Sequence, residues 1–488
     1  MPPLLSKSKY LTGLQCPKYL WMQIHEAERI PEVDAVTQYV FDQGHLVGEY
    51  AKKLFPGGID IPHDDFMENI VTTRNLLVER KPLFEAGMLS GRIYCRLDIL
   101  NPANEDEWDI IEIKSGTSVK EIYINDVSFQ KFCCEKAGLK IRTCNLGFIN
   151  NQYVKNGEID SKELFILEDI SAQVEEVSED IEEQVSDLLE VISNKACPEM
   201  AIGQHCLTPY ECPLREECWG FLPENSVFDL RGGKTKQFAL WEQGILSIKD
   251  IPDDIPLSRQ QQIQKECVMT GNVHVEKGEI RQFLSKLKYP LYYLDFETFG
   301  PAIPIYDGTR PYQDIPFQFS LHVVESEGCE PVHHSFLAQG TEDPRPQILR
   351  ELQRLLGSEG SIIAYNAGFE ECVLNELVEA FSEYTDWLEG ILTRMVDLLY
   401  PFTNFHYYNA SQKDTASLKR VLPAVTGKGY EEMGIGAGMD ASIAFARIVC
   451  GDASQEEISQ IRADLLKYCK LDTEGMTWVV DKLRELSD

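Results

Sequence analysis

The sequence predicts a mixed α/β protein in which a helical connector joins two α/β parts, and three observations support this fold class. In the first part, strand patterns at Arg92–Leu100 and Trp108–Lys114 are separated by a polar turn and followed by helical periodicity. Between about 220 and 285, helical stretches are interrupted by glycine and proline pairs. From about Tyr289 onward, strand and helix patterns alternate, as in α/β domains.

The length of the chain agrees with this division. A chain of 488 residues is long enough for about three domains. We expect a first α/β domain over 1–220, a helical connector over 221–287 and a second α/β domain over 288–488. The strongly acidic stretch Ser171–Ser193, in the first domain, has helical character, and its charges are expected to form a solvated face.

Composition and charge restrict the function. The hydrophobic content of 43% is that of a globular protein, and we find no run of about 18 apolar residues that would predict a membrane span. The first residues lack the apolar core of a signal peptide, so we expect a cytoplasmic protein. The net charge of −33 argues against a broad basic surface that coats nucleic acid. It does not exclude a nuclease, because bound divalent ions reverse the local field of acidic residues.

The N-terminal strand pair carries a first group of candidate catalytic residues. Asp98 lies on the first strand, and Glu112 and Lys114 lie two residues apart on the second, so the latter two share a face. Two acids can bind divalent ions, and a lysine can stabilise the negative charge that develops on a scissile phosphate. Gln130, on the helix that follows, is placed to reach the same cleft. The alternative for such charges is the solvent face of a strand.

The segment Leu291–Phe299 carries a second and stronger group. It has the aromatic and apolar composition of a strand, and because side chains alternate along a strand, Asp295 and Glu297 point to the same face. Two adjacent carboxylates repel each other unless a cation lies between them. A metal site is therefore predicted here.

Two later segments supply further acids. Glu370 follows the apolar strand at 362–365 and lies at a helix start, where an acid is favoured. Tyr468 and Asp472 are four residues apart on a predicted helix and so share a face. Four such acids suit a two-metal site with Mg²⁺ or Mn²⁺ that catalyses in-line phosphoryl displacement, and Tyr468 would orient the attacking water.

On these motifs, residues 290–488 resemble the DEDD superfamily of ribonuclease H-like 3′→5′ exonucleases, in the subgroup whose last motif begins with tyrosine. The resemblance implies that Asp295, Glu297, Glu370 and Asp472 bind the metals. The family usually has aspartate where this chain has Glu370. A further acid, Asp397, is either an accessory residue or a support for the fold.

The Asp98, Glu112–Lys114 and Gln130 pattern resembles the RecB-like branch of the PD-(D/E)XK nucleases. The chain departs from that branch at Cys134, where a tyrosine is usual, and at Gly48, where a metal-binding histidine is usual. The chain has one cysteine near its start and three regularly spaced cysteines near residue 212. This arrangement resembles that of the members of the branch that bind a [4Fe–4S] cluster, including CRISPR-associated and AddB-type nucleases. The resemblance implies four thiolate ligands to the cluster, with zinc as the rival metal: Cys16, Cys206, Cys212 and Cys218.

Together the motifs lead us to expect a two-headed, metal-dependent nuclease that hydrolyses phosphodiester bonds, acts on DNA rather than RNA and does not bind membranes. The alternative is an RNA-trimming 3′→5′ exonuclease whose N-terminal cysteine-rich module is a non-catalytic platform for nucleic acid. Nothing in the exonuclease motifs recognises a 2′-hydroxyl, so the sequence leaves both polymers open.

Overall fold

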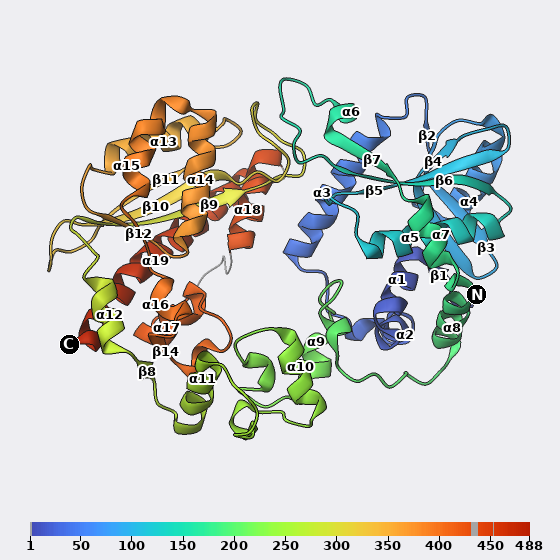
Figure 1. Ribbon diagram of the computed structural model, residues 1–488. Helices are drawn as coiled ribbons and strands as arrows, with labels where there is room; N and C mark the ends of the chain where they lie inside the picture. The colour runs from blue at the N-terminus through green and yellow to red at the C-terminus, as the bar shows by residue number, and fades with distance from the viewer. Residues whose placement is uncertain (1, 431–437, 452) are drawn as a thin grey trace. The chain divides into compact units, whose positions relative to one another are not determined.

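The computed structural model describes residues 2–430, 438–451 and 453–488 (Figure 1). The chain divides into two compact units. Unit 1 contains Met1–Phe221 and Pro301–Tyr312, and unit 2 contains Leu222–Gly300 and Gln313–Asp488. Each unit combines helices with a β-sheet, which confirms the prediction of a mixed α/β protein. Of the residues predicted as a connector, 222–287 lie within unit 2 and Phe221 lies in unit 1.

The sheet of unit 1 contains the predicted hairpin as β4 (Ile93–Pro102) and β5 (Glu107–Lys114). In the described residues this sheet has the order β2-β3-β4-β5-β6-β7, with β1 paired to β4. Strands β3, β4 and β5 are antiparallel, whereas β6 runs parallel to β5. The remaining strands are β1 (Leu5–Ser6), β2 (Ile59–Asp60), β3 (Leu83–Ser90), β6 (Lys140–Ile149) and β7 (Phe165–Asp169).

Helix α5 (Glu121–Lys136) packs against β3, β4 and β6 and buries Val127 and Phe129 in the main core of unit 1. The acidic stretch predicted as helical forms α7 (Ser171–Ser178) and α8 (Ile181–Ser193). The other helices of unit 1 are α1 (Lys7–Gln15), α2 (Pro17–His25), α3 (Ala35–Lys52), α4 (Phe66–Leu76), α6 (Ser161–Leu164) and α9 (Arg215–Trp219).

The sheet of unit 2 is built around β9 (Leu291–Phe299). Its order over the described residues is β11-β10-β9-β12-β13, and β9 pairs antiparallel with β10 and parallel with β12. Helices α13 (Arg345–Leu355), α14 (Ala367–Ala380) and α15 (Thr385–Leu392) lie on one side of the sheet (Figure 1). On the other side α19 (Gln455–Ser487) packs against β9 and β10, and α12 (Lys277–Leu284) and α17 (Leu418–Thr426) pack against α19. Both faces are therefore buried, which explains the continuous apolar character of β9. The other strands are β10 (Ile315–Val324), β11 (Val332–Leu337), β12 (Ser361–Ala364) and β13 (Met395–Asp397).

The predicted connector contains short helices and one strand of a small sheet, in which β8 (His274–Val275) pairs with β14 (Tyr407–Tyr408). None of the described helices has the length and apolar character needed to cross a bilayer. The helices of unit 2 are α10 (Lys234–Glu242), α11 (Arg259–Thr270), α12 (Lys277–Leu284), α13 (Arg345–Leu355), α14 (Ala367–Ala380), α15 (Thr385–Leu392), α16 (Tyr400–Thr403), α17 (Leu418–Thr426), α18 (Gly438–Cys450) and α19 (Gln455–Ser487).

Buried polar side chains join β10 to α19. Gln318 donates to the Leu465 carbonyl at 2.9 Å, and His322 Nδ1 lies 2.7 Å from Thr473 Oγ1. Burial, with a smaller effect of the neighbouring His333, lowers the pKa of His322 to about 3 from its ordinary value of 6.5. The imidazole is therefore neutral in the folded protein at neutral pH.

We expect this histidine to make the folded protein less stable as the pH falls. Because its pKa is lower in the folded than in the unfolded chain, the unfolded chain binds the extra proton below pH 6.5, and stability is lost progressively from there towards about pH 3. Urea unfolding from pH 7 to pH 4 measures the slope. The His322→Gln variant should show a shallower fall than the wild type, and equal slopes would contradict the assignment.

Candidate functional sites

A cavity of about 340 Å³ in unit 2 collects the acidic residues and the tyrosine that were predicted from the sequence to form one site. Its lining includes Asp295, Glu297, Glu370, Tyr468 and Asp472, which come from β9, α14 and α19. The structure thus brings together five residues that are spread over 178 positions of the chain (from 295 to 472, counted inclusively). The lining is completed by Phe296, Thr298, Tyr365, Asn366, Phe369, Ser417, Leu418, Lys419, Gly438 and Ser442.

The turn that leads into α14 positions Glu370. Asn366 precedes the helix with a φ of 74°, a left-handed conformation that asparagine tolerates better than most residues. Asp397 stabilises this turn because its Oδ1 accepts the backbone N–H groups of Asn366 and Leu399, each at 2.9 Å. The structure therefore favours the fold-supporting alternative for Asp397. Glu370 then lies in the first turn of α14 and faces the cavity.

Helix α19 positions the last motif. It starts with a capping box, in which Ser454 and Glu457 satisfy each other's backbone N–H groups. The four-residue spacing places Tyr468 and Asp472 on the same face of the helix, towards the cavity. Both side chains are buried.

Burial raises the pKa values of all four acids, and repulsion from other carboxylates of the site adds to the rise for Asp295 and Glu297. Burial, then repulsion from Asp472 and Glu297, raises the pKa of Asp295 well above its usual range. Burial, then repulsion from Asp472 and Glu370, raises the pKa of Glu297 well above its usual range, although Lys419 opposes the rise. Burial raises the pKa of Glu370 to about 8 and that of Asp472 to about 6. Four carboxylates with these surroundings ionise together only if cations join them.

Three residues at this site were not predicted from the sequence. Tyr430 donates a hydrogen bond to Asp472 Oδ1, and Cys469 Sγ lies 3.5 Å from Asp295 Oδ2. Lys419 lines the cavity, with its ammonium 5.2 Å from the centre of the Tyr468 ring. Cys469 directly follows Tyr468, so its place in the motif was a signal available in the sequence. Tyr430 and Lys419 lie on other elements and gave no such signal.

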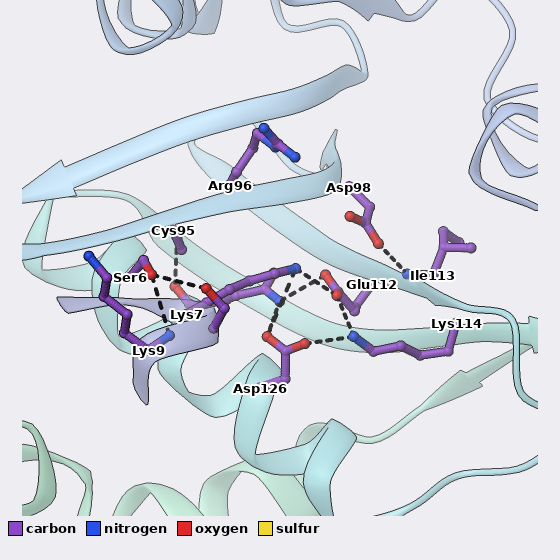
Figure 2. A network of polar contacts seen from close by, with 12 residues as sticks. Ser6, Lys7, Lys9, Cys95, Arg96, Asp98, Glu112, Ile113, Lys114 and Asp126 are labelled. Atoms are coloured by element: carbon purple, nitrogen blue, oxygen red, sulfur yellow. Dashed lines mark hydrogen bonds and ion pairs between the residues drawn. The ribbon is translucent and has the colours of Figure 1, made fainter. Parts of the chain in front are cut away.

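The N-terminal candidates meet in a buried polar cluster of unit 1 (Figure 2). Lys114 contacts Glu112 at 2.7 Å and Asp126 at 2.6 Å, and Gln130 donates to the same two carboxylates at 2.8 and 2.9 Å. Asp98 takes part less directly, because its Oδ2 accepts the backbone N–H of Ile113 at 2.8 Å. The structure thus brings Glu112, Lys114 and Gln130 into contact and leaves Asp98 beside them.

Lys7 and Asp126 were not predicted as members of this cluster. The short strand β1 pairs with β4, and Lys7 follows it at the start of α1. From there its ammonium reaches Glu112 at 2.7 Å and Asp126 at 3.9 Å, on the opposite side from Lys114 (Figure 2). Lysine is unfavourable at a helix N-terminus, so the two acids explain its position.

The two lysines and two acids largely neutralise one another. Burial, then repulsion from Asp126 and Asp98, raises the pKa of Glu112 to about 7, and Lys114 and Lys7 oppose this rise. For Asp126, burial acts in the same upward direction, but the charges of Lys114 and Lys7 outweigh it and hold the pKa below its usual range. A divalent ion at this cluster would therefore compete with ammonium groups for the carboxylate oxygens.

We expect the Lys7→Met variant to unfold more easily and to respond more strongly to Mg²⁺. Removing one ammonium from a buried ion cluster leaves the acids undercompensated, at a cost of about 1–3 kcal/mol. Mg²⁺ at millimolar concentration should recover more stability in this variant than in the wild type. Urea unfolding with and without Mg²⁺ measures both effects. The control is Lys9→Met on the same helix, and equal losses in the two variants would contradict the role of Lys7.

The four predicted cysteine ligands line a small cavity in unit 1. Cys16 lies between α1 and α2, and Cys218 lies on α9. Gln15 holds the two chain segments together by donating to the carbonyls of His205 and Tyr210 at 2.8 and 2.7 Å. Lys18 Nζ lies 3.3 Å from Cys218 Sγ and supplies positive charge beside the thiols. The other two cysteines of this quartet are Cys206 and Cys212.

The quartet fits a group with four thiolate ligands. Burial, together with the neighbouring thiols Cys16, Cys206 and Cys218, raises the pKa of Cys212 to about 11. Burial also raises the pKa of Cys16, and the nearby Cys206 and Cys218 add to this. Four thiolates in one small cavity repel one another, and a bound metal group would relieve this repulsion and stabilise the thiolate forms.

Comparison with known proteins identifies relatives for part of the chain. Residues 292–417 match the family model "Domain of unknown function (DUF2779)". This match includes Asp295, Glu297 and Glu370 and ends before Tyr468 and Asp472.

Two proteins illustrate the more distant similarity. "Uncharacterized protein MG366" of Mycoplasma genitalium is 26% identical over 222 residues, which are 41% of this chain and 33% of that protein. "Uncharacterized protein UU173" of Ureaplasma parvum is 24% identical over 229 residues, 42% of this chain and 32% of that protein. The chain thus spans about a third of the length of these relatives. These descriptions assign no activity, so a functional proposal depends on the chemistry of the sites.

Proposed function

We propose that the protein is a metal-dependent nuclease whose unit 2 is a ribonuclease H-like 3′→5′ exonuclease of the DEDD type, acting on DNA. The observation that carries this proposal is the cavity that collects Asp295, Glu297, Glu370, Asp472 and Tyr468. The mixed five-stranded sheet formed by the described residues, crossed on one face by α19, is consistent with that fold.

The residues of the cavity would divide the work of phosphodiester hydrolysis. Bound Mg²⁺ or Mn²⁺ would supply the charge that activates water and stabilises the leaving oxygen. The four carboxylates would hold these ions. Burial, with the charges of Asp472 and Glu297, keeps the pKa of Tyr468 far above neutrality, so its hydroxyl stays protonated and can orient the attacking water. Lys419 would attract the phosphate backbone.

For unit 1 we propose a RecB-like PD-(D/E)XK module with a [4Fe–4S] cluster bound by the cysteine quartet. The four thiols line one small cavity and would hold such a cluster, with a single zinc ion as the rival, and iron and zinc analysis separates the two.

Two single-site variants test the proposal that unit 1 and unit 2 each contain a nuclease site. The purified protein is incubated with matched single-stranded DNA and RNA in Mg²⁺ or Mn²⁺, and products are followed from labels at either end. We expect Asp295→Asn to remove 3′→5′ shortening, and Lys114→Ala to remove a separate cleavage that the first variant retains. Preference for RNA would contradict the choice of DNA.

A second candidate function has its own support. The carboxylates of the unit 1 cluster are already paired with Lys7 and Lys114, so a catalytic divalent ion would have to displace ammonium groups there, which favours a role without cleavage. Unit 1 would then be a non-catalytic platform for nucleic acid, and unit 2 an RNA-trimming exonuclease. If Lys114→Ala leaves all cleavage unchanged but weakens nucleic-acid binding, unit 1 is a non-catalytic platform and the proposal of a second nuclease site fails.

A further inference from the structure

Cys469 places a buried sulfur atom directly behind the lining of the unit 2 cavity, 3.5 Å from Asp295 Oδ2. Its Sγ, Asp295 and Glu297 offer three potential ligand atoms within 4.8 Å of one another. Cys469 is fully buried and precedes Asp472 by three residues on α19, so both residues lie on the side of the helix that packs against β9. The three ligands come from two elements whose packing holds them in place.

An independent feature of the same cavity also points to a bound cation. Glu370 is only 2% exposed, and its Oε2 has no hydrogen-bond partner among the described residues. A buried carboxylate oxygen without a partner is costly, and native proteins pair such groups with donors or metals. The side chain lines the cavity that contains Asp295 and Glu297, so an ion bound there would satisfy it.

The kind of ion follows from the ligand atoms. Carboxylate oxygens alone suit hard ions such as Mg²⁺, whereas a thiolate favours softer ions. We propose that Cys469 Sγ is a metal ligand beside Asp295 and Glu297, and that it makes one metal position of this site prefer a transition-metal ion of the Co²⁺ and Zn²⁺ class over Mg²⁺. This inference rests on the metal-dependent function proposed for the same site.

A buried thiol that only fills space would behave differently. In that case its hydrogen bond to Asp295 would be its main polar contact, and a serine of similar size would replace it without altering metal choice. A thiolate ligand, in contrast, transfers charge to Co²⁺ and produces an absorption band that oxygen ligands do not give. The spectrum therefore separates the two roles.

The experiment titrates Co²⁺ into the full-length protein after loosely bound divalent ions are removed, with the group at the cysteine quartet left in place. We expect a charge-transfer absorption band from the thiolate to Co²⁺ that stops growing once one equivalent of Co²⁺ is bound at this site. It should appear in the wild type and in the control variant Cys372→Ser, because Cys372 is exposed on α14. The band should be absent in Cys469→Ser, and the ratio of Co²⁺ to Mg²⁺ affinity should fall at least about 10-fold.

Two further measurements keep the test decisive. Circular dichroism checks that Cys469→Ser folds. If it does not, Glu297→Gln retains the thiol but removes a neighbouring ligand, and the same equivalent of the band should be lost. Identical spectra for the wild type and Cys469→Ser, or for the wild type and Glu297→Gln, would overturn the assignment of the thiolate.

Cleavage assays separate this inference from the proposed function. If the band is lost in Cys469→Ser but no metal supports cleavage by the wild type, the assignment of the ligand stands and the nuclease proposal fails. If Asp295→Asn abolishes cleavage while the band is unaffected by Cys469→Ser, the nuclease proposal stands and the assignment of Cys469 as a metal ligand fails.

Discussion

Replacing Asp295 with asparagine is expected to reduce 3′→5′ degradation by at least about 10³-fold. The amide has nearly the size of the carboxylate, so it fits the same space, but it carries no charge to hold a divalent ion. The loss follows from the position of Asp295 between β9 and α19, beside Cys469 and facing the cavity that also holds Glu297 and Asp472. Single-turnover degradation of an end-labelled strand measures it.

The same variant should be more stable than the wild type when divalent ions are absent. Burial and the charges of Asp472 and Glu297 oppose ionisation of Asp295, so its carboxylate destabilises the metal-free fold. Its removal should raise the unfolding temperature of unit 2 by roughly 2 °C. Mg²⁺ should then stabilise the wild type more than the variant. Asp386→Asn, an exposed acid on α15, should change neither property. A variant that cleaves at the wild-type rate would exclude Asp295 from the catalytic site.

Replacing Cys212 with serine is expected to have the largest effect on stability. The quartet joins the start of unit 1 to residues 206–218, so a group bound there closes a loop of nearly 200 residues. By analogy with other cross-links of this span, its loss should cost about 3–5 kcal/mol. We expect the variant to lose its iron and its visible absorption and to unfold at a lower temperature.

The control for this variant is Cys197→Ser. Cys197 is exposed and is not part of the cysteine quartet, so its replacement should leave metal content and stability unchanged. Anaerobic purification, a visible spectrum and iron and zinc analysis measure the outcome. A colourless wild type with one zinc ion would overturn the cluster, and an unchanged metal content in Cys212→Ser would overturn the quartet.

Local patterns were sufficient for the parts of the site that lie on single elements. Alternation along β9 predicts that Asp295 and Glu297 share a face, and helical spacing predicts the same of Tyr468 and Asp472. The structure has these four residues in one cavity with Glu370. The hairpin of β4 and β5 was likewise predictable, because its strands are separated by a short polar turn. The roles of these residues in catalysis stay predictions.

Contacts between distant segments were not predictable in this way. Lys7 reaches Glu112 across 105 residues, and Cys469 reaches Asp295 across 174. No period of 2 or 3.6 residues relates such positions. Their proximity depends on how β1 pairs with β4 and on how α19 is rotated against β9.

The sequence by itself determined the types of element, the two acidic motifs and the four cysteines, because periodicity, spacing and residue chemistry are local properties. Only the tertiary structure decided the charge balance of the sites. It places Lys7 against Glu112 and Asp126 in unit 1, and Cys469 and Tyr430 against the acids of unit 2. The physical reason is that electrostatic and ligand interactions depend on distance in space, and packing between elements sets that distance.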